Sequence, residues 1–392
     1  MAPVWRRRFA GDIHTRPVEN GRLCFEGAVL TTLLIGCGFS TQVPSQGLGP
    51  DGTGSTPDSG VPGDTTPTTT PTVRRIDIGA GRVSGGPHAD FPLLVTAALT
   101  SAHPMGFDIY FSSDQAGTGK LAHEIERYQP NELVAWVKVP SLSASTTLYL
   151  HYGDTSITTS QENRAAVWTA SYAAVWHMSS LDDATLQNPG TNTGSTSAGG
   201  KIASARDFNG NGNVIDAASG GMVDNVFAGG GTMEAWFTAT SWGQSGLGRI
   251  FDKGPSSTVL SMCDGNQQAS LLFGRTFSSG AGNWCTNANT LTLDTWTYVA
   301  VVYDEGSSSN VPTFYINGVA APIGQTSSPS GSASSDGAGA LTIGDRSNGG
   351  RAFAGRIDEA RLSSVSRSAA WITTTYENQR EPATFCVLSP PL

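Results

Sequence analysis

From Val73 onward the chain is a series of short segments in which apolar and polar residues alternate, and turn residues end each segment. Residues 107–111, 146–152 and 313–318 show the pattern, with β-branched and aromatic side chains at alternate positions. A period of two places one set of side chains on a buried face, as in a half-buried strand. The segments recur every 10–15 residues with no helical period. This spacing predicts an all-β chain built from sandwiches.

Composition supports strands joined by turns and argues against some partners. The 392 residues include 48 glycines, and only 14 % are charged, which favours turn-rich β structure. The length allows two or three domains. The net charge is −9, and phosphate backbones need basic patches, so we expect no nucleic-acid partner. No apolar run reaches the ~18 residues that a membrane-spanning helix needs.

Ahead of the strands, an apolar run from Ala28 to Ile35 ends in Gly36-Cys37. Residues 34–37 resemble a bacterial lipobox, in which the cysteine becomes the lipidated first residue of the mature protein. Residues 1–36 then form a lipoprotein signal peptide, and Cys37 carries the membrane anchor. Gly38 after the cysteine favours the outer membrane or the cell surface of a bacterial envelope. The alternative is a chance Gly-Cys pair, since Glu26 interrupts the leader and its apolar run is short.

Residues 37–73 are predicted to be a disordered linker rich in Pro, Thr, Gly and Ser. From residue 50 to 72 there is no Lys, Arg or aromatic residue, so the segment cannot bury enough apolar surface to offset its ordering entropy. The prolines favour extended backbone of ~3 Å per residue, enough to hold a domain up to ~100 Å from a bilayer.

The first group of strands, 74–160, carries several motifs in a fixed order. They lie at 74–76, 90–95, 107–109, 123–126, 136–140 and 149–153. This series resembles a family of bacterial extracytoplasmic domains called DUF2341. The resemblance implies a small β-sandwich of secreted or surface multidomain proteins, and it implies no known activity.

A second group, 172–380, carries another ordered series. Its motifs lie at 207–210, 233–236, 296–304, 314–318 and 355–362. The series resembles the LamG-like jelly roll of the concanavalin A-like lectin/glucanase superfamily. That fold hosts many functions, so the resemblance implies none in particular. Residues 381–392 remain as a C-terminal tail.

Three cysteines lie beyond the linker. Cys263 and Cys285 are near the ends of what we interpret as adjacent strands, so a disulfide between them is predicted in an oxidising compartment. Cys386 is left over in the tail. The alternative is three reduced thiols. No C-x-x-C spacing indicates zinc.

No catalytic motif of the superfamily is present, and we expect no enzyme. Its glycosidases use a Glu-x-Asp-x-(x)-Glu strand, which this sequence lacks. Asp358 and Glu359 are adjacent, so in a regular strand they face opposite sides. Glu124 and Glu126 share a strand face, where exposed acids are ordinary. His177 follows Trp176 and is predicted to be a packing residue.

The candidate ligand-binding residues come from the jelly-roll resemblance. Such domains often bind a calcium ion through carboxylates and carbonyls, and the candidates are Asp207 and Asp358, with Asp182 and Asp183 as further choices. The alternative is that Asp207 and Asp358 satisfy backbone donors at strand ends.

Trp242 and Trp284 lie in Gly/Ser-rich context and are candidates for exposed rings that stack on sugars. The alternative is that they cap the core. The sequence thus predicts a lipid-anchored, non-catalytic binding or adhesion module for a surface glycan or protein. A structural envelope protein without a soluble ligand, or a glycan hydrolase with carboxylates from separate strands, are the other hypotheses.

Overall fold

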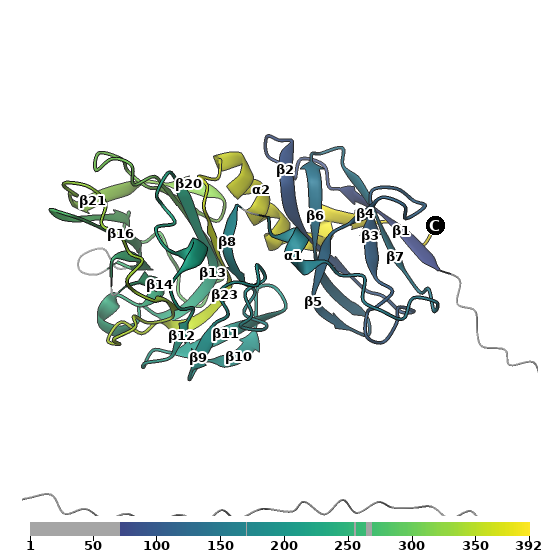
Figure 1. Cartoon of the computed structure of the whole chain (residues 1–392), viewed down its shortest axis with the longest axis horizontal. Helices are drawn as coiled ribbons and strands as arrows, with labels where there is room; N and C mark the ends of the chain where they lie inside the picture. The colour runs from purple at the N-terminus through teal and green to yellow at the C-terminus, as the bar shows by residue number, and fades with distance from the viewer. Residues whose placement is uncertain (1–70, 170, 255, 264–268) are drawn as a thin grey trace, which may run out of the picture. The chain divides into compact units, whose positions relative to one another are not determined.

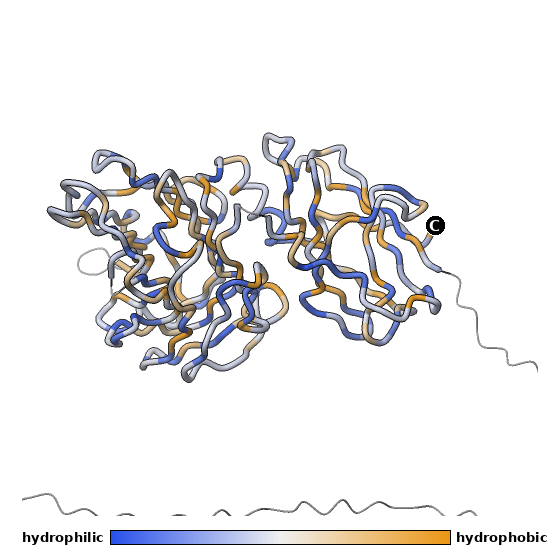
Figure 2. Tube along the Cα trace, in the orientation of Figure 1, coloured by the Kyte–Doolittle hydropathy of each residue, from blue (hydrophilic) through white to orange (hydrophobic). Residues whose placement is uncertain are grey.

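The computed structural model describes residues 71–169, 171–254, 256–263 and 269–392. Strands dominate this part of the chain and form two sandwiches, so the predicted all-β class is confirmed (Figure 1). Apolar stretches run along the strands of both sandwiches (Figure 2). None of the described helices has the length and apolar character to cross a membrane. The leader, Cys37 and nearly all of the 37–73 linker lie outside the described residues.

The first sandwich pairs a five-stranded sheet, in the order β24-β1-β7-β3-β4, with a three-stranded sheet, β2-β6-β5. The strands are β1 (Thr72–Ile78), β2 (His88–Ala97), β3 (Tyr110–Ser112), β4 (Lys120–Leu121), β5 (His123–Gln129), β6 (Glu132–Leu142), β7 (Thr147–Tyr152) and β24 (Cys386–Leu388). Alternate residues of both sheets, among them Leu93, Val137 and Leu150, form the core. The helix α1 (Arg164–Val167) follows β7 and precedes the second sandwich.

The second sandwich is a jelly roll of two eight-stranded sheets. The first, here called the β13 sheet, contains β8 (Tyr172–Trp176), β10 (Thr196–Gly199), β11 (Ser204–Asn209), β13 (Gly231–Ser241), β18 (Thr297–Tyr303), β19 (Thr313–Ile316), β20 (Val319–Ala321) and β23 (Ala354–Ser363). The second, the β16 sheet, contains β9 (Thr191–Thr193), β12 (Val214–Asp216), β14 (Arg249–Lys253), β15 (Thr258–Met262), β16 (Leu271–Phe277), β17 (Gly280–Thr286), β21 (Ile323–Ser327) and β22 (Leu341–Ile343). Two 3₁₀ turns, η1 (Gly221–Val223) and η2 (Gln244–Gly246), complete it.

The C-terminal segment returns to the first sandwich. Helix α2 (Ala369–Arg380) begins at Ser368, whose side chain caps the Trp371 N–H, and α3 (Pro382–Phe385) follows. The strand β24 then pairs with β1, matching Ile78 to Cys386. Residues 381–392 are therefore not a tail, and α2 is a helix that the sequence reading missed.

Helix α2 also covers part of the outer face of the β13 sheet. Trp236 on β13 donates its indole N–H to Gln379 at 2.6 Å, and the Tyr376 ring stacks on Trp236. On the other side, the Asn378 amide pairs with both the N–H and the carbonyl of Leu94 on β2. The core cluster of the first sandwich consequently includes side chains of the β13 sheet as well as of α2.

The predicted disulfide is confirmed. Cys263 and Cys285 are bonded, and they lie beyond β15 and on β17 of the β16 sheet. Cys386 is a free, fully buried thiol on β24, and burial raises its pKa.

Candidate functional site

Asp207 and Asp358, the two aspartates predicted from the sequence as calcium ligands, have different surroundings and different partners. Asp207 is 43 % exposed and pairs with Arg356 across β11 and β23 at 3.6 Å. Asp358 is buried, and its Oδ2 accepts the Ile202 N–H at 2.9 Å. Calcium takes six to eight oxygen ligands, and these surroundings do not supply them. The residues present therefore do not fit a calcium site.

The expectation of an exposed loop position for Trp284 is wrong. Trp284 lies on β17 and is fully buried, with its ring near those of Phe273 and Tyr303. It pairs with Phe273 across β16 and β17, and that row of the sheet points inward. Gly282 leaves room for the indole, because a side chain there would overlap the ring. Trp242 is half-buried at the edge of the same core.

A buried cluster of carboxylates surrounds His177, where β5 of the first sandwich meets β8 and β23 of the second. Glu124 and Glu126 come from one face of β5, His177 directly follows β8, and Glu359 comes from β23. His177 Nδ1 lies 2.9 and 3.0 Å from the two Glu359 oxygens and 3.7 Å from Glu126 Oε2. Its Nε2 lies 3.4 Å from Glu124 Oε2. The predicted packing histidine is thus the centre of an ionic cluster.

The two glutamates of β5 have opposite pKa shifts. Burial works to raise the pKa of Glu124, but His177, the Trp168 indole N–H at 2.6 Å and the ion pair with Arg164 at 2.8 Å outweigh it, and the pKa is lowered. Burial and the nearby charge of Glu359 raise the pKa of Glu126 to about 7. Neighbouring carboxylates with divergent pKa values are frequent at functional sites.

These neighbours favour the protonated form of His177. Burial disfavours its charged form, but Glu359, Glu124 and Glu126 together raise the pKa of His177 well above its usual value. The Glu126 carboxylate also accepts the Trp136 indole N–H at 2.9 Å and the Ser179 hydroxyl at 2.7 Å. Each nitrogen of the imidazole therefore faces a carboxylate whose position is fixed by further contacts.

A β-bulge places both Asp358 and Glu359 on the outer face of β23. Between the pairs Trp236–Asp358 and Glu234–Arg361, β23 has one residue more than β13, and Glu359 adopts φ 50°. An extra residue shifts the alternation of side chains, so neighbours can share a face. The expectation that Asp358 and Glu359 face opposite sides is therefore wrong.

Arg361 balances part of this charge. Its guanidinium contacts Glu359 and lies over the Trp136 and Trp168 rings, 4.4 and 5.1 Å from their centroids. Cation–π contact of this kind stabilises a desolvated guanidinium.

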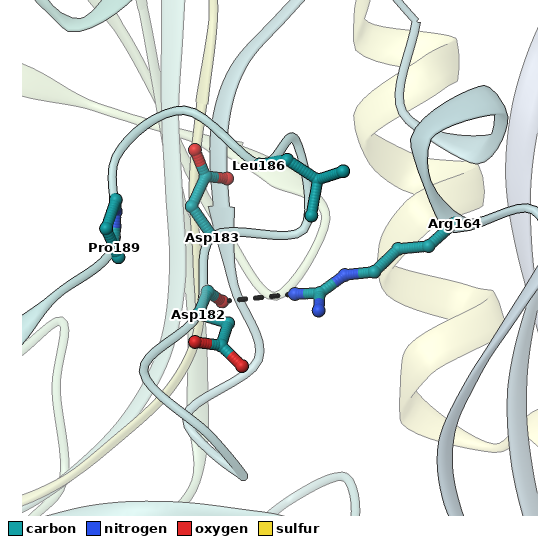
Figure 3. A pocket seen from close by; sticks show the side chains of 5 residues that line it. All are labelled: Arg164, Asp182, Asp183, Leu186 and Pro189. Atoms are coloured by element: carbon teal, nitrogen blue, oxygen red, sulfur yellow. Dashed lines mark hydrogen bonds between the residues drawn. The ribbon is translucent and has the colours of Figure 1, made fainter.

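Two cavities open beside the cluster and share Arg164. One, of about 190 Å³, is lined by Glu124, Glu126, Arg164, His177 and Ser179, among others. The other, of about 250 Å³, is lined by Arg164 and the loop residues Asp182, Asp183, Leu186 and Pro189 (Figure 3). Figure 3 shows Arg164 reaching from α1 to the carbonyl of Asp182, at 3.3 Å.

The two aspartates of this second cavity have different surroundings. The Asp183 carboxylate is buried and accepts backbone N–H groups of its own loop, including those of Thr185 and Asn188. Asp182 instead offers its carbonyl to Arg164, and its carboxylate is held by the Ser180 hydroxyl. Asp183 therefore stabilises its own loop.

A separate groove of about 180 Å³ crosses the outer face of the β16 sheet. Leu260, Phe273 and Trp284 pair across β15, β16 and β17 and point into the core. The neighbouring row therefore points outward. The residues that line the groove include Arg249, Val259, Leu272, Gly274, Asn283 and Thr326.

Two family models match the chain in succession. Residues 105–186 match the domain of unknown function DUF2341, and residues 209–373 match the concanavalin A-like lectin/glucanases superfamily. The chain carries a DUF2341 domain followed by a concanavalin A-like domain. The DUF2341 match includes Glu124, Glu126 and His177, whereas Glu359 comes from the concanavalin A-like domain. No curated protein matches the sequence.

Several solved structures resemble about half of the chain. Domain 4 of AbnA, a GH43 extracellular arabinanase from Geobacillus stearothermophilus in complex with arabinotriose, is 20 % identical, with a TM-score of 0.37, over 52 % of this chain and 96 % of that one. The binding domain of Paraclostridial Mosquitocidal Protein 1 is 12 % identical, with a TM-score of 0.41, over 53 % and 52 %. The receptor binding domain of botulinum neurotoxin C/D mosaic serotype is 11 % identical, with a TM-score of 0.41, over 53 % and 51 %. The chain spans about half the length of these two toxin domains.

Sequence reasoning dismissed the residues that converge at the junction. A usable signal was present, since two acids spaced by one residue on β5 lie beside an apolar isoleucine. The partners of these acids could not be found from the sequence, because Glu359 and His177 are separated by 182 positions.

Proposed function

We propose that the protein is a non-catalytic binding module at the bacterial cell surface. In this proposal a lipid on Cys37 anchors it in the envelope, and the groove on the outer face of the β16 sheet binds a surface glycan or protein. The observation that carries the proposal is the unequal use of the two jelly-roll faces. The outer face of the β13 sheet is occupied by α2 and the DUF2341 domain, whereas no described α-helix packs on β14 to β17 (Figure 1).

The lining of the groove suits an amphipathic ligand. Val259 and Leu272 provide apolar floor, and Gly274 between them adds no side chain. The Asn283 amide has no hydrogen-bond partner among the described residues and is half-buried at the groove. Ligand sites combine apolar lining with a few oriented polar groups in this way.

Arg249 supplies a positioned cation at one end of the groove. It pairs with Asp252 at 2.9 Å and donates to the Leu247 carbonyl and the Ser256 hydroxyl. Because these contacts fix the guanidinium before a ligand arrives, little side-chain entropy is lost on binding. A sugar hydroxyl or a carboxylate is a chemically suitable partner for it.

Glycan arrays and pull-downs from cell-surface extracts test the binding claim. The matched pair of variants is Gly274→Val, which fills the groove, and Gly199→Val on β10, where a side chain meets open space. A Cβ at Gly274 meets the end of the Asn283 side chain at 2.8 Å, so the fold can adjust. We expect Gly274→Val to lose the ligand and Gly199→Val to keep it. Silence in both assays, or equal binding by both variants, overturns the proposal.

The anchor is tested separately in cells. Cys37→Ser should move the protein from the membrane fraction to the soluble fraction, because the lipid can no longer be attached. Unchanged fractionation contradicts the anchor while leaving the groove untouched.

A further inference from the structure

We propose that Glu126, His177 and Glu359 bind one divalent transition-metal ion of the Zn²⁺ class at the junction of the two domains. One donor atom from each of these residues lies within 4.8 Å of the others, although the residues come from three different strands or strand ends. This site is distinct from the groove on the β16 sheet and does not depend on it.

The spacing of the donor atoms suits a shared ion. Two ligands bound tetrahedrally at 2.0–2.2 Å lie about 3.3 Å apart. His177 Nδ1 is 2.9 Å from Glu359 Oε1 and 3.7 Å from Glu126 Oε2, values on either side of that separation. Glu359 holds its place with a left-handed φ of 50°, and such backbone strain is concentrated at functional sites.

The junction contains more carboxylates than cations. Its acidic side chains are Glu124, Glu126, Asp358 and Glu359, with Glu234 on β13 close to Arg361. The fixed cations facing them are Arg164 and Arg361, and Lys201 lies within electrostatic reach of Asp358. With a neutral imidazole and ionised carboxylates the junction would carry an excess of negative charge, and buried charges are paired or coordinate metals.

Asp358 adds a second observation, because burial, Glu359 and Glu126 raise the pKa of this carboxyl group well above its usual value. It is fully buried, and its Oδ1 has no hydrogen-bond partner among the described residues. The bulge of β23 turns it to the same outer face as Glu359, and the charge of Glu126 reaches it. A divalent ion beside Glu126 and Glu359 would offset the cost of this orphaned oxygen.

The surroundings orient the proposed ligands as metal sites require. Metal-bound histidines usually direct their second nitrogen to a carboxylate. Here Nε2 of His177 faces Glu124 at 3.4 Å, and Glu124 is held by Arg164 and by the Trp168 indole N–H. Glu124 is a positioning residue in this arrangement.

The adjoining cavity allows an ion to enter and a further ligand to bind. The cavity of about 190 Å³ is lined by both Glu126 and His177, so an exchangeable ligand oxygen has room beside them. One imidazole and two carboxylates suit zinc, iron, nickel or manganese better than calcium, which prefers oxygen alone. The competing occupant is a proton on His177, which would hold the carboxylates together by itself.

In the test, the purified full-length chain is first stripped of metal with EDTA. It is then titrated with Zn²⁺, and separately with Co²⁺ as a spectroscopic probe. We expect one equivalent to bind by calorimetry, Co²⁺ to give visible absorption bands, and the melting temperature to rise. Glu126→Gln and Glu359→Gln should abolish this binding, and Glu124→Gln should weaken it about 10- to 100-fold. Asp207→Asn, an exposed carboxylate on β11, is the control and should bind as the wild type does.

Folding is monitored by the melting temperature of each variant without metal, and Glu→Gln changes preserve side-chain size. If Glu126→Gln or Glu359→Gln fails to fold, the wild-type protein decides the matter alone. Proton NMR of His177 then distinguishes the occupants. An imidazole protonated on both nitrogens at saturating Zn²⁺ overturns the proposal, as does wild-type protein without a stoichiometric site or unchanged affinity in Glu126→Gln and Glu359→Gln.

Discussion

The two sandwiches differ in how they close their cores. Among the described residues, the jelly roll draws the sixteen strands of its two sheets from positions between Tyr172 and Ser363. The first sandwich begins at β1 but is completed by α2, α3 and β24 from the far end of the chain. Phe385 and Cys386, both fully buried, belong to its core. The first sandwich is therefore discontinuous in sequence, and its stability depends on residues beyond the second.

The largest expected effect comes from deleting residues 369–392. The deletion removes the partner of β1 and exposes Trp236 and the first-sandwich core, so the first sandwich should unfold while the jelly-roll interior persists. Hydrogen exchange read by mass spectrometry should show lost protection in β1, β2 and β7 and retained protection in β16. Equal loss in both sandwiches would mean that the jelly roll also depends on the C-terminal segment.

Removing the disulfide should destabilise the jelly roll and leave the first sandwich unchanged. The bond joins residues separated by 22 positions, and closing a loop of this size contributes about 3 kcal/mol to stability. The double variant Cys263→Ser/Cys285→Ser should lower the free energy of unfolding of the jelly roll by roughly this amount. Hydrogen exchange of β2 and β6 serves as the internal reference and should not change.

Asn378→Ala tests the link between α2 and the first sandwich. The substitution leaves the N–H and carbonyl of Leu94 without their side-chain partners in a buried place. An unsatisfied buried polar group costs about 1–3 kcal/mol, so denaturant unfolding should shift by that amount. An unchanged midpoint would indicate that water replaces the amide at this edge of β2.

The smallest effect is expected at Tyr303, and a second buried tyrosine, Tyr298, provides the comparison. The Tyr298 hydroxyl, on the junction side of the β13 sheet, donates to Glu234, whereas the Tyr303 hydroxyl faces the jelly-roll core without a partner among the described residues. Tyr298→Phe should destabilise by about 1–3 kcal/mol, because it leaves Glu234 without its donor. Tyr303→Phe should be neutral or slightly stabilising at pH 7. Chemical denaturation of the two variants side by side measures the difference.

Tyr303 also predicts a pH dependence. Burial and the nearby charge of Glu305 raise the pKa of Tyr303 to about 12, from the ordinary value of 10. Between pH 10 and about 12, Tyr303 loses its hydroxyl proton in the unfolded chain but keeps it in the folded chain. The free energy of unfolding therefore falls as the pH rises through this range. Tyr303→Phe should reduce this alkaline loss, and an identical pH profile would show that other tyrosines dominate it.

Local patterns predicted the strands well because alternation depends on neighbours in sequence. The rows that contain Phe273 and Trp284, or Leu93 and Val137, are buried as a period of two requires. The helix α2 was missed because its buried face includes polar residues, among them Thr374, Asn378 and Gln379. Their burial is compensated by hydrogen bonds to distant strands, which no periodicity reveals.

The site was harder to predict for a related reason. The bulge at Glu359 adds one residue to β23, and it is recognised only from the pairing of β13 with β23. Strand alternation alone therefore could not show that the side chains of Asp358 and Glu359 lie on the same face. Trp284 was misplaced because the glycines beside it indicated a loop, whereas Gly282 serves to make room for the buried indole. Gly and Ser in a strand can thus report tight packing as well as turns.

The pairing of β24 with β1 has a mechanical consequence. The Leu392 N–H bonds to the Val73 carbonyl at 2.9 Å, so the two ends of the described chain leave the fold side by side. Tension applied through the residues before Thr72 enters at β1, a strand held on one side by β7 and on the other by β24. A pull from that direction must shear two strand interfaces at once.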